Sequence, residues 1–193
     1  MTKLLAFAGS TRRNSFNQAV LEVAAQGARE AGVDVTIIHL KDYEMPIFNQ
    51  DEEQEFGIPE RARAFKQLLM EHDGFLIASP EYNSSYPAVL KNAIDWASRM
   101  EDGEKPLQAY KGKVAGIMAA SAGGLGGIRV LVVLRMLLAN LGITVLPTQV
   151  AVAKVDTLMD DSGVITDEKT VKQLKNLGKQ TAELTIKFTA QVL

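Results

Sequence analysis

Short apolar runs alternate with longer amphipathic segments along the whole chain. The runs have the length of β-strands, whereas the longer segments carry apolar residues at helical spacing. The apolar runs are Leu4–Ala8, Val33–Leu40, Phe75–Ser79, Val114–Ala120 and Ile143–Val152. The predicted helices lie at about Asn17–Ala31, Pro59–Glu71, Pro87–Met100, Leu125–Leu141 and Asp167–Gln191. This alternation predicts an α/β fold, a parallel sheet with helices on both faces.

The polarity of the runs predicts the order of the strands. The central runs are continuously apolar, as strands buried on both faces are. The second contains Asp34, Thr36 and His39, and the fifth contains Pro147, which cannot donate a ladder hydrogen bond. Placing the second and fifth at the edges gives the order 2-1-3-4-5, that of a flavodoxin-like three-layer sandwich, with its ligand at the carboxyl ends of the strands. Other doubly wound orders also fit this pattern.

The composition fits one globular domain spanning residues 1–193. Hydrophobic residues make up 47% of the chain and charged residues 23%, an ordinary globular balance. The net charge of −2 gives no reason to expect a nucleic-acid partner. The chain has no cysteine, which excludes disulfides and thiolate chemistry, and His39 and His72 lack the spacing of metal ligands.

No apolar run has the length of a targeting or membrane segment. Leu4–Ala8 is too short for the core of a signal peptide, and every later run is interrupted before it could span a bilayer. We therefore expect a cytoplasmic protein without a membrane partner. Two acidic clusters, Asp51–Glu53 with Glu55 and Asp160–Gly163, lack the spacing of a calcium loop. We interpret both as solvated loops or turns.

A loop rich in hydrogen-bond donors, Gly9–Gln18, follows the first strand. Its hydroxyl groups, its two arginines and the start of the next helix offer the donors and positive field that a phosphate requires. Gly9 is expected to permit a tight turn with close backbone approach. Ser15-x-x-Gln18 is also a capping box, which needs no ligand. The paired arginines and the number of hydroxyl groups favour phosphate binding.

A second polar loop follows the third strand and precedes Pro87, which suits the first turn of a helix. It offers the flat side chains of Tyr82 and Tyr86 beside polar Glu81, Asn83 and Ser85. A planar heterocycle needs such a surface, with a face to rest on and a few polar groups for its ring atoms. The sequence therefore predicts that this loop contacts a flat ring. We interpret Trp96, in the helix that follows, as a core or subunit-interface residue.

A glycine-rich stretch, Gly123–Gly127, follows the fourth strand but is a poor dinucleotide fingerprint, because Arg129 stands where the third glycine belongs. The predicted helix Leu125–Leu141 hardly has a polar face, since Arg129 and Arg135 are its only charged residues. This pattern predicts burial in a subunit interface, which we expect the Leu125–Leu141 and Pro87–Met100 helices to form. For the two arginines we favour ion pairs in the interface over a place at its solvent rim.

At this point the motifs resemble those of the NADPH-dependent FMN reductases, a flavodoxin-like family that includes NAD(P)H:quinone, azo-dye and chromate reductases. The resemblance covers nearly the whole chain. It rests on motifs after the first, third and fourth strands, namely Gly9-Ser10-x-Arg12-x-x-Ser15-x-Asn17, Ser79-Pro80-Glu81-Tyr82-Asn83, Pro87-x-x-Leu90-Lys91-Asn92-Ala93-Ile94-Asp95-Trp96 and Ser121-x-Gly123-Gly124.

The resemblance implies a homodimer or homotetramer, a bound FMN and a role for each motif. The phosphate would be bound by the first motif and its neighbour, Ser10, Arg12, Ser15, Asn17 and Gln18. The edge of the isoalloxazine would be lined, largely through backbone groups, by Pro80, Glu81, Tyr82 and Asn83, with a further contact from Ser85. The other side of the ring would be closed by Ser121, Gly123 and Gly124. Ser84 departs from the glycine of many relatives, which puts the local turn and the side-chain role of Ser85 in doubt.

The activity implied is ping-pong transfer of hydride from NADPH or NADH through FMN to a small acceptor, such as a quinone, azo dye, metal oxyanion or flavin. No side chain is assigned as a catalytic acid or base. Two alternatives stay open, a flavodoxin-type electron carrier and a flavin-binding sensor without turnover. The two arginines of the phosphate loop and the small net charge favour the enzyme. The physiological acceptor and the choice between NADPH and NADH are not readable from the sequence.

Overall fold

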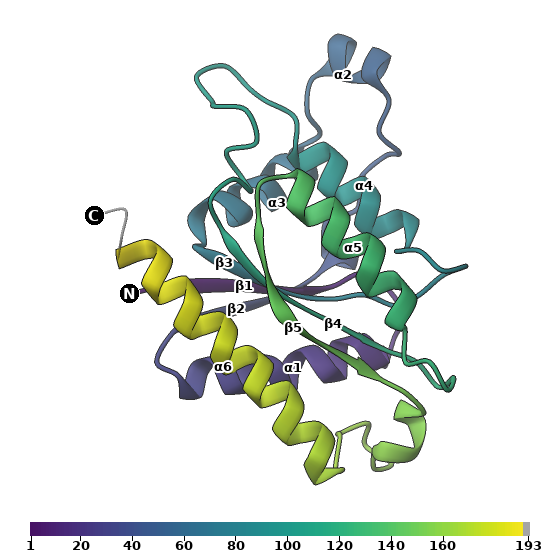
Figure 1. Ribbon diagram of the computed structural model, residues 1–193. Coiled ribbons are helices and arrows are strands. Elements are labelled where there is room, and N and C mark those ends of the chain that lie inside the picture. Colours follow the sequence, from purple (N-terminus) through teal and green to yellow (C-terminus); the bar gives the residue numbers. More distant parts are fainter. Residues whose placement is uncertain (191–193) are drawn as a thin grey trace.

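The computed structural model describes residues 1–190 of the chain, and its centre is a parallel five-stranded sheet. The strand order is β2-β1-β3-β4-β5, which confirms the order expected from the sequence (Figure 1). The strands are β1 (Lys3–Ala8), β2 (Asp34–His39), β3 (Gly74–Ala78), β4 (Val114–Ala120) and β5 (Thr144–Val152). All five carboxyl ends therefore meet at one edge of the sheet.

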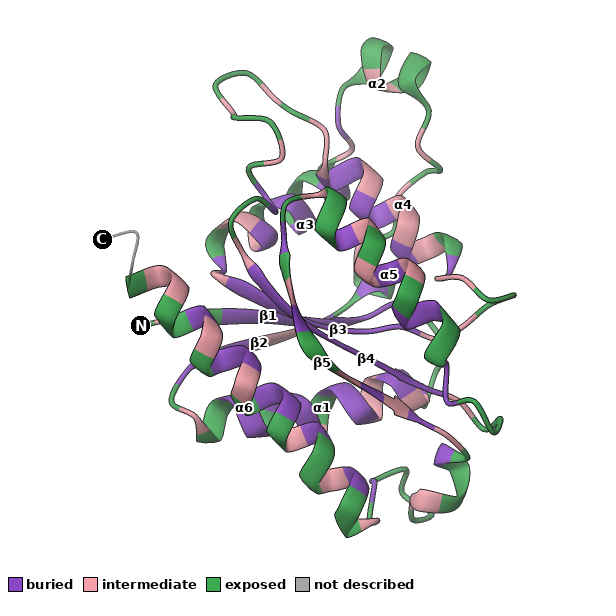
Figure 2. Ribbon diagram, viewed as in Figure 1, coloured by how far each residue is buried: buried purple, intermediate pink, exposed green. Residues whose placement is uncertain are grey.

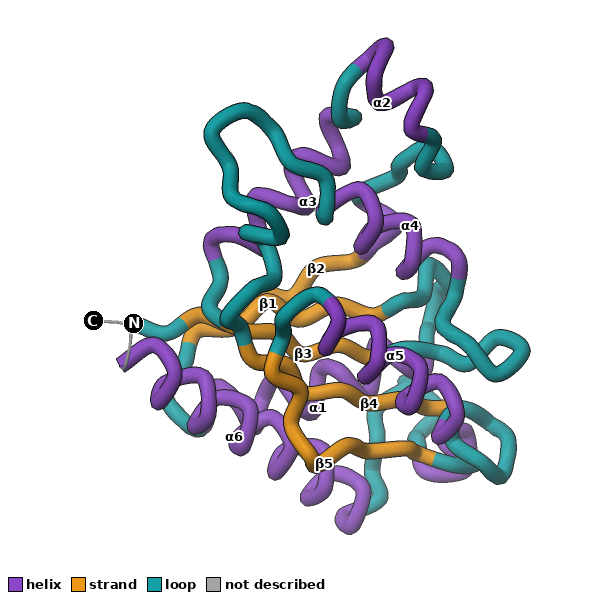
Figure 3. Tube along the Cα trace, turned by 45° about the horizontal axis from the view of Figure 1, so that its top comes forward, coloured by secondary structure: helices purple, strands orange, loops and turns teal. Residues whose placement is uncertain are grey.

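Five helices cover the two faces of the sheet (Figure 3). One face carries α1 (Phe16–Glu30) and α6 (Glu168–Ala190). The other carries α3 (Glu60–Glu71), α4 (Ala88–Ala97) and α5 (Ile128–Asn140). The expected end of the last helix at Gln191 lies outside the described residues. None of the described helices is both long and apolar enough to cross a membrane.

Burial of the strands follows their place in the sheet (Figure 2). Strands β3 and β4 are buried throughout, and β1 is exposed only at Lys3. Strands β2 and β5 contain exposed as well as buried residues, as edge strands do. The pairing of β4 with β5 shifts register where Pro147 lies, and Arg135 donates to the Val145 carbonyl there (3.2 Å). Pro147 is thus accommodated at an irregular edge, as expected.

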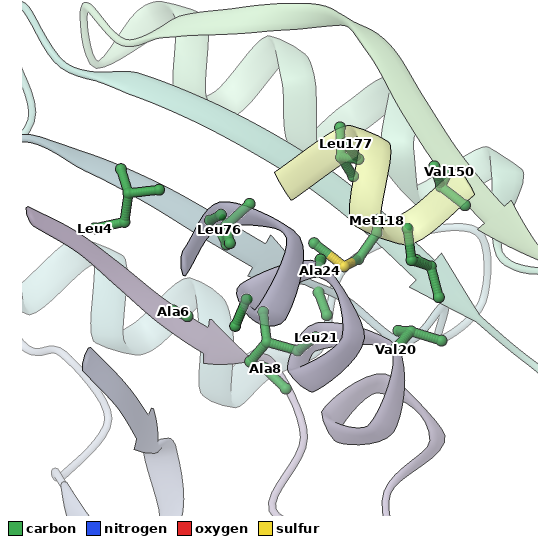
Figure 4. Close-up of a cluster of buried hydrophobic side chains, with 14 of the residues drawn as sticks. Leu4, Ala6, Ala8, Val20, Leu21, Ala24, Leu76, Met118, Val150 and Leu177 are labelled. Atoms are coloured by element: carbon green, nitrogen blue, oxygen red, sulfur yellow. The ribbon is translucent and has the colours of Figure 1, made fainter. Parts of the chain in front are cut away.

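The core is divided between the two faces of the sheet. On the α1/α6 face, side chains of both helices interlock with inward residues of β1, β3 and β4 (Figure 4). The two helices contact backbone to backbone, because a Cβ on Gly178 would overlap the carbonyl oxygen of Ala24. On the other face, Phe65 of α3 packs edge-on against Phe7 of β1. Both faces of the sheet are therefore covered by buried apolar side chains.

The acidic segment after β2 is a helix, α2 (Gln50–Phe56), and the expectation of a solvated loop was wrong. No residue of α2 is buried, and the helix stands away from the body of the molecule (Figure 1). The Asn49 side chain accepts from the Asp51 N–H (3.0 Å), and carboxylates in the first turn favour the helix start. Glu53 of α2 forms a 2.7 Å ion pair with Arg99.

The base of this segment is also anchored to α4. The Pro46 carbonyl accepts from the Trp96 indole N–H (2.8 Å), and the Trp96 ring packs edge-on against Phe48. Trp96 is almost completely buried, so of the two places expected for it, core and subunit interface, it takes the core.

Candidate functional site

The loops after β1, β3 and β4 leave the sheet side by side. Each loop begins with a hydrogen bond to a neighbouring strand or its end: the N–H of Gly9 donates to Ala78, that of Ser79 to Met118 and that of Ser121 to Val152 (2.8, 2.9 and 3.1 Å). The Gly9 bond joins the loop after β1 to β3, and the Ser79 bond joins the loop after β3 to β4. The three sequence motifs are therefore brought to one place at the carboxyl edge of the sheet.

The start of α1 within the Gly9–Gln18 loop has free donors. Ser15 is the N-cap residue, but its hydroxyl makes no capping bond, and the Gln18 amide donates to Glu22 (3.3 Å). The capping box that the sequence allowed is therefore not formed. An α-helix cannot satisfy the first N–H groups of its own first turn. These N–H groups and the positive end of the helix dipole make an anion site.

Gly9 packs closely against α4, whereas its expected close approach to a ligand stays a prediction. Its φ is not in the left-handed region, and a Cβ there would lie 2.9 Å from the side chain of Leu90 in α4. The glycine is thus needed so that α4 can pack against the end of β1. This packing keeps the first loop close to the helix that follows the second loop.

A cavity of about 480 Å³ lies at this first loop and is lined by Ser10, Arg12, Ser15 and Gln18. The Arg12 guanidinium lies 4.7 Å from the centre of the Phe16 ring, which holds its charge beside the first residue of α1. The Ser10 hydroxyl accepts from the Arg12 N–H (3.3 Å). Positive charge, hydroxyl groups and the helix start thus share one cavity.

Asn17 joins two of the loops. Its side-chain amide donates to the Ala120 carbonyl and accepts from the Ala120 N–H, both at 3.0 Å, and the residue is buried. The amide oxygen and nitrogen are therefore committed to β4. Asn17 can face a ligand through its backbone N–H, while its side chain fixes α1 to the end of β4 and hence to the Ser121 loop.

The loop after β3 contains a two-residue reverse turn. Tyr82 and Ser85 exchange two backbone hydrogen bonds (2.9 and 3.0 Å), and the residues between them, Asn83 and Ser84, have φ of 51° and 68°. Positive φ at both central positions is the type I′ pattern, which glycine adopts without strain. Ser84 therefore keeps the turn that glycine would make. Tyr82 projects from this turn with 56% of its surface exposed.

Glu81 uses its carboxylate to cap the start of α5. It accepts from the N–H groups of Arg129 and Val130 (3.0 and 3.2 Å) and from the Arg129 guanidinium (2.6 Å). Burial raises the pKa of the Glu81 carboxyl, but the bonds from Arg129 and Val130 outweigh burial and leave the pKa below its ordinary value. Glu81 is therefore left to face a ligand through its backbone alone.

The arginines of α5 bind within the chain, and their expected ion pairs across a subunit interface stay a prediction. Arg129 pairs with Glu81, and Arg135 donates to Gln149 at 3.0 Å as well as to Val145. Arg135 thereby satisfies backbone carbonyl groups at the irregular part of β5. Neither contact requires a second copy of the chain.

The Ser121–Gly127 loop contains two kinds of glycine. Gly127, the N-cap of α5, has φ 82°, and a Cβ on it would lie 2.7 Å from Ala119, so the fold itself requires glycine there. Gly124 has no heavy atom within 4 Å of a built Cβ, and Gly123 has only the Ser121 hydroxyl at 3.7 Å. Folding does not demand glycine at these two positions, and they leave the backbone open to close approach from outside.

The structure adds residues that the motifs did not reveal. His39 and Lys41, at and after the end of β2, line the same cavity as Arg12. Because β2 pairs with β1 in register Ala8 with His39, the predicted strand order could have shown this. The segment Asp156–Gly163 after β5 also lines the cavity, and no sequence signal linked it to the first loop.

One of its carboxylates is held by its own turn. The Asp160 carboxylate accepts from the Ser162 hydroxyl and from the N–H groups of Ser162 and Val164 (2.6, 2.9 and 3.0 Å), which lowers the pKa of Asp160. The second acidic cluster is thus an exposed turn, as interpreted, that reaches the phosphate loop.

Comparison with known proteins decides which family this is. The family model of the NADPH-dependent FMN reductases matches residues 2–157. The chain belongs to this family. It is 35% identical over 168 residues to an NAD(P)H-dependent FMN reductase of Pseudomonas aeruginosa (86% of each chain), and 37% identical over 174 residues to a 2-hydroxy-1,4-benzoquinone reductase of Burkholderia sp (90% of each).

A solved structure gives the same family resemblance. The flavoenzyme NAD(P)H:(acceptor) oxidoreductase of Paracoccus denitrificans aligns with a TM-score of 0.78 and 28% identity, over 97% of this chain and 99% of that one. Family membership confirms the expectation of an NAD(P)H-dependent oxidoreductase with FMN as cofactor.

The residues at this edge of the sheet fit FMN. A phosphate monoester suits the uncapped start of α1 with Ser10 and Arg12, because it accepts many hydrogen bonds and carries negative charge. A flat ring suits the sheet edge where the Tyr82 turn and the Ser121–Gly127 loop leave the strands, because Gly123 and Gly124 place no side chain there. The individual contacts to FMN stay predictions.

Proposed function

We propose that this protein transfers hydride from NAD(P)H to a quinone through FMN bound at the three loops. The observation that carries the proposal is the convergence of the three motifs at one sheet edge, where the start of α1 has free donors. Azo compounds, metal oxyanions and free flavin are further acceptors of the same kind. When bound, FMN supplies the chemistry by accepting and donating hydride.

The chain's own residues bind the phosphate of FMN, orient its ring and leave the ring surface open. Backbone N–H groups at the start of α1, with Ser10, Arg12, Ser15 and Gln18, hold the phosphate. Backbone groups of the β3 loop hold one edge of the ring, and Ser121, Gly123 and Gly124 lie on its other side. No described side chain in these loops is assigned as an acid or base, and the exposed Tyr82 leaves solvent as a proton source.

The open ring surface supports a ping-pong order. Tyr82 borders it without covering it, so NAD(P)H and the acceptor can use the same surface in turn. Quinone is proposed as the acceptor because two relatives carry the names 2-hydroxy-1,4-benzoquinone reductase and quinone reductase. They are 37% identical to this chain over aligned stretches of 174 and 130 residues.

A purified protein tests this proposal. We expect flavin absorbance, NADPH oxidation that depends on added benzoquinone, and parallel double-reciprocal plots when both substrates are varied. Arg12→Gln should weaken FMN binding about tenfold, the value of one lost charge-assisted bond. The control is Arg63→Gln, which removes an arginine of α3 that pairs with Glu101 and should leave FMN affinity unchanged. Bound flavin without turnover would favour a carrier or sensor, and no flavin binding would refute the proposal.

We also propose that the protein is a homodimer or homotetramer through α5. Ile128, Val132 and Met136 are 40%, 64% and 59% exposed and lie four residues apart, so they form one apolar stripe on the outer surface of this helix. The large apolar residues of α4 lie mostly in the core, so α4 supports the interface less than the sequence suggested.

A further inference from the structure

A second cavity of about 340 Å³ adjoins the phosphate loop on the α4 side of the sheet. It lies between the segment after β2 and the first turns of α4. Thr11 and Lys41 line both this cavity and the one at the start of α1, so the two cavities meet at these residues. The remaining walls are Leu40, Tyr43, Glu44, Met45, Val89, Asn92 and Ala93.

The walls of this cavity suit a flat heterocycle. Leu40, Met45, Val89 and Ala93 are apolar, and the Tyr43 hydroxyl adds a polar group. The Asn92 side chain is already used, because it accepts from the Phe48 N–H and donates to Pro46 (2.8 Å each). The volume falls in the range of small-ligand sites, which starts at roughly 300 Å³.

Both signs of charge meet where the cavities join, because Arg12, Arg13 and Lys41 share the lining of the cavity at the start of α1 with Glu22, Asp156, Asp160 and Asp161. Lys41 is exposed and forms no ion pair with any carboxylate in the part of the chain that the structure describes. Glu44 is the carboxylate that lines this cavity. Burial raises the pKa of the Tyr43 hydroxyl, the Asp42 carboxylate adds to the rise, and the Arg61 guanidinium opposes it. Lys41 is thus a free cation at the boundary between a phosphate site and an apolar cavity.

The cavity also lies beside the ring loop. Val89 belongs to the first turn of α4, which starts directly after the Tyr82–Tyr86 segment. A dinucleotide whose nicotinamide rests at the ring loop can therefore extend its other end along α4. The start of α1 holds one phosphate in the proposed function, which leaves Lys41 for a second.

We propose that this cavity binds the adenosine end of NADPH and that Lys41 binds its 2′-phosphate. The inference rests on the proposed function and deepens it by assigning a preference for NADPH over NADH. Adenine packs against the apolar walls, whereas the 2′-phosphate, absent from NADH, lies toward Lys41. Lys41 is then a specificity residue that contacts neither the reacting atoms nor the flavin phosphate.

Calorimetry on FMN-saturated protein tests this assignment with 2′,5′-ADP and 5′-AMP as probes. We expect tighter binding of 2′,5′-ADP. Lys41→Gln should weaken 2′,5′-ADP on the order of tenfold, as loss of a charge-assisted bond does, with 5′-AMP and FMN affinities unchanged. The ratio of kcat/KM for NADPH over NADH should fall by the same factor. Val89→Phe, which fills the cavity, should weaken both nucleotides.

The control is Lys105→Gln, which removes an exposed lysine from the loop before β4, at the opposite edge of the sheet. The proposal is overturned if Lys41→Gln behaves like this control. It is also overturned if Lys41→Gln weakens FMN and both nucleotides alike, because Lys41 then serves the flavin phosphate. A prior FMN titration keeps the tests separate: absence of flavin binding refutes the proposed function, whereas flavin binding with an unchanged nucleotide preference refutes only the role of Lys41.

Discussion

Ser84 occupies a backbone conformation that suits glycine. Its φ of 68° lies in the left-handed region, which costs a non-glycine residue roughly 1–2 kcal/mol. Glycine removes this strain but loses more freedom on folding, which offsets about half of the gain. We therefore expect Ser84→Gly to raise the free energy of unfolding by about 0.5–1 kcal/mol and Tm by roughly 2–3 °C.

Thermal unfolding of Ser84→Gly beside Ser84→Ala checks this prediction. Alanine removes the hydroxyl and keeps the strained Cβ, so that variant should not be stabilised. Equal Tm values for the two variants would show that φ at position 84 is not the cause. Because the turn bears the exposed Tyr82, the test also reports on the ring loop of the proposed FMN site.

Two side chains show why donor chemistry alone does not assign a residue's role. Asn17 and Glu81 belong to motifs that the sequence tied to FMN, and both have suitable polar groups. In the fold, the Asn17 amide binds Ala120 and the Glu81 carboxylate binds the start of α5. A hydrogen-bonding group looks the same in the sequence whether it holds a ligand or another loop, and only the tertiary structure separates the two roles.

At the scale of elements, Glu81 joins the ring loop to α5. A carboxylate that caps a helix is worth about 0.5–2 kcal/mol, and the largely buried Glu81 also pairs with Arg129. We expect Glu81→Gln to lower the free energy of unfolding by about 1 kcal/mol at pH 7. The control is Glu183→Gln. Glu183 pairs with Lys179 on α6, and both side chains are about half exposed, so this variant should change the free energy of unfolding by less than about 0.5 kcal/mol.

The effect of Glu81→Gln should depend on pH. The folded-state pKa of Glu81 lies below that of unfolded glutamate, so its contribution is fully present above about pH 4.5. It is lost as the pH falls through the folded-state pKa, where protonated glutamate resembles glutamine. Urea unfolding of the wild type and the variant from pH 7 to pH 3 measures this, and a constant difference across the range would contradict the assignment.

The elements themselves were largely predictable, because buried parallel strands are continuous apolar runs and the larger helices repeat apolar residues at helical spacing. α2 was missed because it buries nothing, so its sequence has no apolar period to detect. Its signals were local: Asn49 as the cap and carboxylates in the first turn. The predicted start of α5 at Leu125 was three residues early, because Gly127 with φ 82° caps the helix there.

At the scale of the whole molecule, strand order followed from polarity, since Asp34 and Pro147 mark strands that the sheet leaves at its edges. The positions of the two cavities could not be predicted from this polarity. One forms where the end of β2 and the Asp156–Gly163 segment approach the loop before α1, and the other where the segment after β2 approaches α4. How closely these segments approach depends on how the helices pack on the sheet, for example on the close contact of α1 and α6 at Gly178. Short sequence motifs do not contain this information.

The apolar stripe of α5 bears on assembly. Ile128, Val132 and Met136 expose apolar surface on one line of an otherwise well-packed helix, and covering such surface favours association. We expect sedimentation velocity to show a dimer or tetramer at micromolar concentration. Val132→Lys combined with Met136→Lys should shift the protein to monomers, because association would have to bury unpaired charges.

Val164→Lys provides the control for that variant. Val164 is 56% exposed, much like Val132, but lies in the turn after Asp160, away from α5. Its substitution should leave the sedimentation coefficient unchanged. Both variants should retain wild-type thermal unfolding of the monomer fold, since neither site contributes a buried side chain. A wild-type monomer, or an equal shift by both variants, would show that the stripe on α5 is not the surface that joins copies of the chain.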